Sequence, residues 1–131
     1  MDNLFIHHLG IVVKSIDEYM QYSLFKNIKK RVYDSIQHSN IALLETNNDL
    51  YLEIIEPIDE KSTTYNFLNR NGGGYHHICF LLENQHQLNE IIEEKKIKIF
   101  WGPKPAILFN NKNIVFGFSR NKELIEFIIN D

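Results

Sequence analysis

The sequence predicts an α+β fold of two βαβββ modules that form a cupped mixed sheet with helices on its outer face. The main observation is an internal repeat. The segment Ile6–Ser15 matches Tyr75–Asn84 at an offset of 69 residues, with a double histidine, an apolar run, a charge and a helix-capping residue in the same order. Leu50–Ile55 matches Glu123–Ile128 at an offset of 73 residues. Two matches in the same order at nearly one offset indicate a duplicated unit.

Module one, about residues 4–57, has the pattern strand, helix and three strands. Phe5–Val13 is apolar on both faces, which is typical of a buried strand. Ser15 with Glu18 three residues later is a capping box, and it predicts a helix that begins there. Apolar residues follow at helical spacing, at Ile16, Tyr19, Met20 and Leu24. Three strand-like runs complete the module, Val32–Gln37, Asn40–Leu44 and Leu50–Ile55.

Module two, about residues 74–130, repeats this order. Tyr75–Leu82 predicts a strand, and Asn84 with Gln87 predicts the start of a helix. Three further strands are expected near Lys98–Trp101, Asn113–Phe118 and Leu124–Ile129. The linker, about residues 58–73, predicts a short helix that is capped by Ser62 or Thr63 and ended by the glycines at 72–74. We expect residues 1–131 to be a single domain.

Composition limits the classes of function. The 131-residue chain has one cysteine, which excludes an intrachain disulfide framework. Fourteen basic and seventeen acidic residues give a net charge of −3, which argues against binding to the phosphates of nucleic acid. The first residues lack a basic region followed by a long apolar run, and no apolar stretch is long enough to span a bilayer. We expect a cytoplasmic protein that acts on a small molecule, without nucleic-acid or membrane partners.

The double histidines separate into two groups by strand alternation. His8 and His77 occupy matching positions on one face of their strands, whereas His7 and His76 lie on the opposite face. Cys79 shares the face of His77, where a lone thiol is expected to pack as a small apolar group. We therefore take His8 and His77 as the candidate functional histidines.

Two glutamates lie at matching positions inside apolar strands, Glu53 in module one and Glu126 in module two. A carboxylate buried alone costs several kcal/mol or is forced to take up a proton. Two such carboxylates with His8 and His77 avoid this cost if all four converge on a divalent cation. A set of two imidazoles and two carboxylates suits Zn²⁺, Co²⁺, Ni²⁺, Mn²⁺ or Fe²⁺.

These motifs resemble the vicinal oxygen chelate superfamily, to which glyoxalase I belongs, and within it they are most similar to methylmalonyl-CoA epimerases. The resembling segments span almost the whole chain: His8–Lys14, Leu52–Pro57, Ser62–Leu68, Gly73–Cys79 and Leu124–Phe127.

The resemblance implies a metal-dependent epimerase or isomerase that removes the proton next to the carbonyl of a methylmalonyl-CoA-like acyl thioester. It implies one divalent ion held by His8, Glu53, His77 and Glu126, with Glu126 as the first candidate base and Glu53 as the second. Some epimerases of this kind are thought to use a further glutamate on an early strand, and Asn40–Leu44 contains no carboxylate. A glyoxalase-type lyase and a non-catalytic binding member of the superfamily are the alternatives, and a homodimer is left open.

Overall fold

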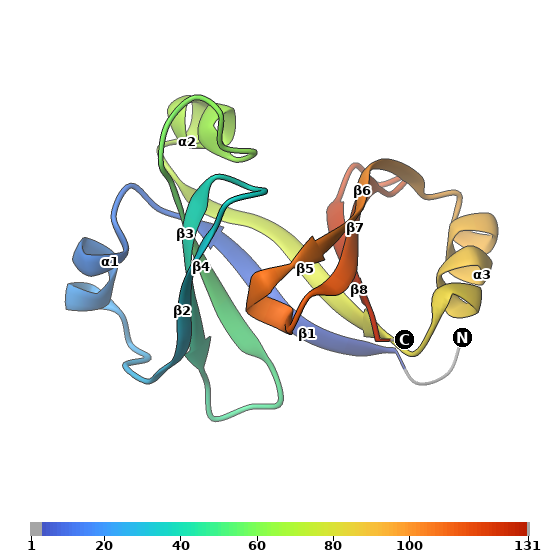
Figure 1. Cartoon of the computed structure of the whole chain (residues 1–131), viewed down its shortest axis with the longest axis horizontal. Helices are drawn as coiled ribbons and strands as arrows, with labels where there is room; N and C mark the ends of the chain where they lie inside the picture. Colours follow the sequence, from blue (N-terminus) through green and yellow to red (C-terminus); the bar gives the residue numbers. More distant parts are fainter. Residues whose placement is uncertain (1–3, 131) are drawn as a thin grey trace. The chain divides into compact units, whose positions relative to one another are not determined.

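The computed structural model describes residues 4–130, which form two compact units (Figure 1). The N-terminal unit comprises residues 8–76, and the C-terminal unit comprises residues 4–7 and 77–130. Strand β1 (Phe5–Val12) and strand β5 (Gly74–Leu82) each contribute residues to both units. The element order along the chain gives two βαβββ modules, so the predicted α+β class is confirmed. No helix among the described residues is both long and apolar enough to cross a bilayer.

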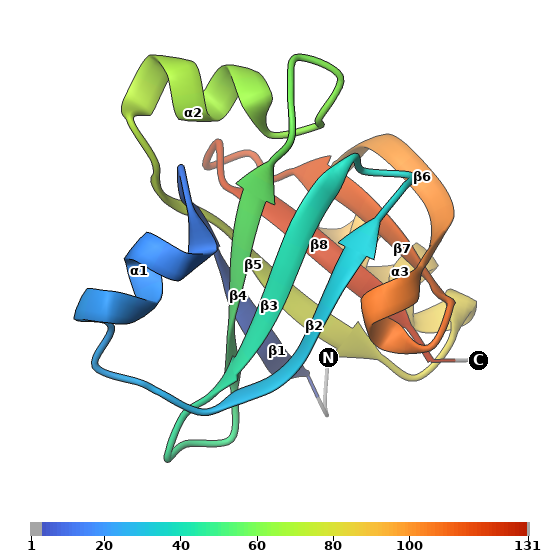
Figure 2. The ribbon, with the colours of Figure 1, turned by 60° about the vertical axis from the view of Figure 1, so that its left-hand side comes forward.

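The strands of the N-terminal unit pair in the order β2-β3-β4-β1. After β1 come α1 (Ile16–Tyr22), β2 (Ile28–Asp34), β3 (Ser39–Glu45), β4 (Tyr51–Pro57) and α2 (Tyr65–Asn71). Strands β2, β3 and β4 are antiparallel neighbours, as Figure 2 shows, and β4 pairs with β1 in parallel. This parallel pair brings the end of module one back beside its beginning, and it carries both candidate site residues of the unit.

Helix α1 begins as the sequence predicts and ends earlier. The Ser15 hydroxyl accepts the Glu18 N–H at 3.1 Å, which satisfies one of the free donors of the first turn. Ile16 is fully buried against apolar residues of β3 and β4. The helix stops at Tyr22 because the following serine is extended. The expectation that Leu24 belongs to the apolar helix face is therefore wrong, since this side chain is 94% exposed.

The linker helix is present, but its predicted cap is wrong. Thr64 holds the capping position and makes no side-chain cap bond. The Ser62 hydroxyl instead donates to the His38 carbonyl and accepts the Ile58 N–H, so it ties the linker to the turn between β2 and β3. The predicted glycine stop is confirmed, because Gly72 adopts the left-handed conformation and its N–H closes on the carbonyl of residue 68.

The strands of the C-terminal unit pair in the order β5-β8-β7-β6. The elements after β5 are α3 (Gln85–Lys95), β6 (Lys98–Ala106), a 3₁₀ turn (Ile107–Phe109), β7 (Lys112–Phe118) and β8 (Leu124–Ile129). Asn84 caps α3 by accepting the Gln87 N–H at 2.9 Å, as predicted. Strand β5 is parallel to β8, and β8, β7 and β6 are antiparallel neighbours, so this unit repeats the mixed pairing of the first.

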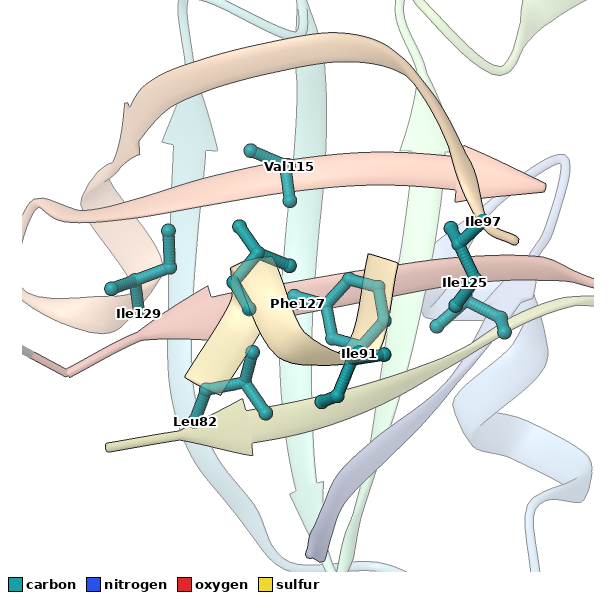
Figure 3. Close-up of a cluster of buried hydrophobic side chains, with 8 residues drawn as sticks. Leu82, Ile91, Ile97, Val115, Ile125, Phe127 and Ile129 are labelled. Atoms are coloured by element: carbon teal, nitrogen blue, oxygen red, sulfur yellow. The ribbon is translucent and has the colours of Figure 1, made fainter. Parts of the chain in front are cut away.

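The core of the C-terminal unit fixes the direction of the β8 side chains. Apolar residues of α3, β5, β7 and β8 form one buried cluster with Phe127 at its centre (Figure 3). Ile125, Phe127 and Ile129 all belong to this cluster, so one face of β8 packs against the helix. Because strand side chains alternate, Glu126 points to the opposite face.

Two strands have bounds that differ from the sequence prediction. Strand β2 begins four residues before the predicted Val32 and ends at Asp34 instead of Gln37, so it includes the basic residues 29–31. Strand β6 continues past Trp101 through Pro103 and Pro105 to Ala106. Each is an edge strand: among residues 4–130 it has a strand neighbour on one side only. Charges and prolines are tolerated at such positions because few ladder bonds depend on them.

Candidate metal centre

The N-terminal unit holds a buried histidine–glutamate pair on its parallel strands. His8 on β1 is fully buried, and Glu53 on β4 is 4% exposed. His8 Nε2 lies 3.4 Å from Glu53 Oε1. In the pairing of β1 with β4, Gly10 is the partner of Glu53, so the histidine precedes that partner by two residues and shares its face.

The C-terminal unit holds the equivalent pair. His77 on β5 is fully buried and Glu126 on β8 is 1% exposed, with 2.9 Å between His77 Nε2 and Glu126 Oε1. In the pairing of β5 with β8, Cys79 is the partner of Glu126, and the histidine again precedes that partner by two residues. The internal repeat therefore extends to strand register, and each module builds its pair in the same way.

The other two histidines of the repeat pack against aromatic rings. His7 meets Phe109 edge-on with 5.0 Å between ring centroids, and His76 meets Phe67 at 4.8 Å. Both histidines are half-buried. Aromatic contacts of this kind account for a partly buried imidazole without a metal.

The carboxylates differ in their cross-strand neighbours, which sequence reasoning did not single out. Leu43 of β3 lies opposite Glu53 and is 4% exposed. Phe116 of β7 lies opposite Glu126, and its ring meets the His77 ring edge-on at 5.3 Å. The bounds of β7 and β8 were predicted to within a residue. Aligning the two strands by their alternating apolar residues would therefore have identified Phe116 as the neighbour of Glu126.

The donor atoms of both pairs suit a divalent cation. The four buried residues His8, Glu53, His77 and Glu126 could hold a metal ion, and each offers an imidazole nitrogen or a carboxylate oxygen. Two neighbouring ligands at about 2.1 Å from an ion lie about 3 Å apart, close to the separations in both pairs. The 3.4 Å separation in the N-terminal unit exceeds an ordinary N–H···O hydrogen bond. The N-terminal pair is therefore a looser contact than the C-terminal pair, in which 2.9 Å separates the same two atoms.

Two exposed ionisable groups of the N-terminal unit have displaced pKa values. The Lys29 ammonium donates to the Tyr51 hydroxyl at 2.6 Å, and this hydrogen bond raises the pKa of Lys29. The Asp59 carboxylate accepts the Lys61 N–H at 2.9 Å and lies 3.1 Å from His38 Nε2, and these contacts lower the pKa of Asp59. The His38 side chain is half-buried and contacts Asp59 in this way.

A hollow of about 580 Å³ in the N-terminal unit lies away from the histidine–glutamate pair. Its walls include Ile11 and Val13 of the β1 end, Tyr19 of α1 and Leu52 of β4. The side chains of Ile11, Val13 and Leu52 point to the face opposite the one that carries His8 and Glu53. The hollow therefore opens on the helix side of the strands. It is therefore separate from the candidate metal centre.

The sequence profile of the Glyoxalase/Bleomycin resistance protein/Dioxygenase superfamily matches residues 7–116. The chain belongs to this superfamily, and the resemblance seen in its motifs is confirmed. The mitochondrial methylmalonyl-CoA epimerase of Dictyostelium discoideum is 26% identical over 116 residues, which cover 85% of this chain and 68% of that protein.

Solved structures show the same fold. A hypothetical protein from Bacillus halodurans superposes with a TM-score of 0.85 at 23% identity, over 99% of this chain and 96% of the other. A variant of Streptomyces coelicolor methylmalonyl-CoA epimerase in complex with 2-nitronate-propionyl-CoA gives a TM-score of 0.79 at 24% identity, over 94% of this chain and 92% of the other.

Proposed function

We propose that this protein is a divalent-metal-dependent epimerase or isomerase that removes the proton next to the carbonyl of a methylmalonyl-CoA-like acyl thioester. The observation that carries the proposal is the buried histidine–glutamate pair, built twice at equivalent strand positions. Two buried carboxylates are costly to keep unless they serve a cation or a proton transfer.

His8, Glu53, His77 and Glu126 together would hold one ion, with Co²⁺, Mn²⁺, Ni²⁺, Zn²⁺ and Fe²⁺ as the candidates. A bound divalent cation would stabilise the negative charge that develops on a carbonyl oxygen when the neighbouring carbon loses its proton. The burial of all four side chains excludes water from them, which strengthens every charge interaction among them.

The proton transfers belong to the carboxylates in this proposal. Glu126 accepts the α-proton, and the electron pair of the broken C–H bond moves into the carbonyl as an enolate. Glu53 would leave the ion and carry a proton, which it returns to the opposite side of the same carbon, so the C–H bond is formed again with inverted configuration. Glu126 ends protonated and Glu53 ionised, and the pair is then ready for the reverse reaction. General-base help of this kind contributes roughly 10²–10⁴-fold.

The substrate class is supported by the proteins that this chain resembles. The Dictyostelium relative is a methylmalonyl-CoA epimerase, and the Streptomyces structure contains an acyl-CoA analogue. A substrate of this type carries two carbonyl or carboxylate oxygens near the acidic carbon. The interaction partner in this proposal is accordingly a small-molecule acyl thioester.

The test is exchange of the α-proton of methylmalonyl-CoA in D₂O, followed by NMR with metal-loaded protein. We expect exchange well above the metal-free control, and a fall of about 100-fold or more in Glu126→Gln. Glu123→Gln is the matched control, since Glu123 is an exposed glutamate that precedes β8. Metal content is measured in both variants, so that loss of the ion is separated from loss of the base. Exchange no faster than the metal-free control, across several α-branched thioesters, would overturn the proposal and leave a binding role.

One observation favours a glyoxalase-type lyase as the second candidate. On β3, the side chains nearest to Glu53 on its face are Ile41 and Leu43, and both are buried and apolar, whereas Glu45 shares this face at the exposed end of the strand. A further glutamate of the kind thought to act in some epimerases is therefore not present at these two positions. A lyase that acts on the thiol adduct of a 2-oxoaldehyde would show turnover of that adduct and no exchange of methylmalonyl-CoA.

A further inference from the structure

The hollow of about 580 Å³ on the helix side of the N-terminal unit has the size of a small-molecule site. Such sites typically measure about 300–1,000 Å³. The hollow lies where α1 and the segment from α2 to β5 pass the end of β1 (Figure 2). Ile11, Val13 and Leu52 line it from the strands, and every lining residue belongs to the N-terminal unit.

The short length of α1 leaves this space uncovered. Helix α1 has seven residues, whereas α3, the equivalent helix of module two, has eleven. At 1.5 Å per residue, the missing turn leaves roughly 6 Å of strand surface without a helix over it. The chain is extended at Ser23, and the lining residues Tyr22 and Leu24 stay exposed. The corresponding hollow of the C-terminal unit, which the longer α3 helps to line, measures about 260 Å³.

Three glycines, Gly72–Gly74, contribute backbone without side chains to the lining. A Cβ at Gly73 would lie 2.7 Å from the Val12 carbonyl oxygen, so the backbone packs tightly against the end of β1 at this point. A Cβ at Gly72 or Gly74 would meet no atom within 4 Å, so these two residues border open space. A flat ligand can therefore lie directly against this backbone.

The lining combines aromatic side chains with one charge of each sign. Tyr19, Tyr22 and Phe25 supply the aromatic side chains, and Lys14 and Glu18 supply an ammonium and a carboxylate. Both charged side chains are exposed, and among residues 4–130 neither of them forms an ion pair. A ligand with a single charge would pair with one of these groups and be repelled by the other. A ligand head that carries both charges satisfies the two groups together.

We propose that this hollow binds a small apolar zwitterion of the aromatic α-amino acid class. The ligand carboxylate pairs with Lys14, its ammonium pairs with Glu18, and its ring lies among the apolar residues. The aromatic side chains of the lining suit both a planar ring and an ammonium group. The hollow and the His8–Glu53 pair lie on opposite faces of β1 and β4, so this site is separate from the candidate metal centre and independent of the proposed reaction.

The test compares phenylalanine with three analogues, each of which lacks one feature. 3-Phenylpropionate lacks the ammonium, phenethylamine lacks the carboxylate, and alanine lacks the ring. Each is titrated into zinc-loaded and metal-free protein, and amide chemical shifts measured by NMR give both the affinity and the location. The variants are Lys14→Gln and Glu18→Gln. Their matched controls are Lys26→Gln and Glu60→Gln, at exposed residues of the same unit that do not line the hollow.

We expect saturable shifts at Gly72–Gly74 in both the zinc-loaded and the metal-free protein. Phenylalanine should bind roughly two- to fivefold more tightly than either single-charge analogue, the range of an exposed ion pair. It should bind at least about tenfold more tightly than alanine, which buries no ring. Lys14→Gln should remove the advantage over phenethylamine and keep the advantage over 3-phenylpropionate, and Glu18→Gln should do the reverse. Both control variants should keep both advantages.

The absence of saturable shifts at the three glycines up to about 20 mM phenylalanine would overturn the proposal. Equal affinity for phenylalanine and its single-charge analogues would overturn it too, as would unchanged advantages in Lys14→Gln and Glu18→Gln. Shifts that centre on His77 and Glu126 and require zinc would also contradict it, because the ligand would then chelate the ion. Val13→Phe enlarges a side chain of the lining and tests the location without changing a charge. It should weaken phenylalanine binding severalfold, and unchanged binding would count against the hollow as the site.

Discussion

If one ion is shared by the two pairs, removing a ligand from either module should abolish the same metal-dependent stabilisation. The variants are His8→Ala in the N-terminal unit and His77→Ala in the C-terminal unit. The matched controls are His7→Ala and His76→Ala, which change the neighbouring histidine of each strand. Each control loses an aromatic contact and no proposed ligand.

The size of the effect follows from mass action. An ion at one hundred times its dissociation constant stabilises the native protein by about 2.7 kcal/mol. For a chain of this length, that corresponds to an increase in melting temperature of roughly 8–15 °C. Residues that merely support a metal ligand cost up to about 100-fold in affinity when they are lost, so a lost ligand should cost at least as much. At the same ion concentration only about 0.4 kcal/mol then remains, a shift of about 1–2 °C.

The assay is the difference in melting temperature between metal-loaded and metal-free samples of each variant, together with elemental analysis. Replacing a buried histidine by alanine lowers the melting temperature of the metal-loaded and the metal-free sample alike. Taking the difference within each variant therefore removes this cost. The reasoning is refuted if the unmodified protein binds two ions and each variant retains one, because each module would then hold its own. It is also refuted if the controls lose the shift and the His8 and His77 variants keep it, since the assignment of strand faces would be reversed.

Three further predictions concern stability and are checked by urea or thermal unfolding. Phe127→Ala should cost about 3–5 kcal/mol, because this ring is 1% exposed in the core of its unit, whereas Phe118→Ala at 47% exposure should cost under about 1.5 kcal/mol. Gly102→Ala should destabilise more than Gly72→Ala: both residues have positive φ, but only at Gly102 would the new Cβ overlap a backbone carbonyl. Asp59→Asn should remove stability that is present above about pH 4, because the folded-state pKa of Asp59 is lowered. The difference in unfolding free energy between the variant and the unmodified protein should therefore shrink as pH falls through that lowered pKa. A difference that grows would contradict the assignment.

The parts of the fold that sequence patterns predict are those in which local chemistry and the repeat agree. Ser15 and Asn84 cap their helices as expected, because both the side-chain acceptor and the N–H three residues later are local. The histidine–glutamate pairs follow from strand alternation within the repeat. Each parallel pair brings two segments together that are more than 40 residues apart, and the sequence prediction of a mixed sheet did not specify this pairing.

The parts that failed depend on contacts outside the local pattern. Leu24 has the spacing of a helix residue, but the serine before it bonds both backbone groups of Phe25 and turns the chain away. Ser62 has the composition of a cap, yet its hydroxyl is used by the backbone of a turn 24 residues earlier in the chain. Strand β6 has an irregular register between Trp101 and Lys104 that depends on pairing with β7, so it could not be read from β6 alone.

The duplication has a chemical consequence for the proposed reaction. An epimerase interconverts two isomers of nearly equal energy, so the base in one direction must be an adequate acid in the other. Glu53 and Glu126 meet that requirement by being the same residue type at equivalent positions, each beside a buried imidazole. Their cross-strand neighbours differ, with Leu43 beside one and Phe116 beside the other. In the proposed reaction the repeat would therefore supply two matched proton carriers in different surroundings, one beside an aliphatic side chain and one beside an aromatic side chain.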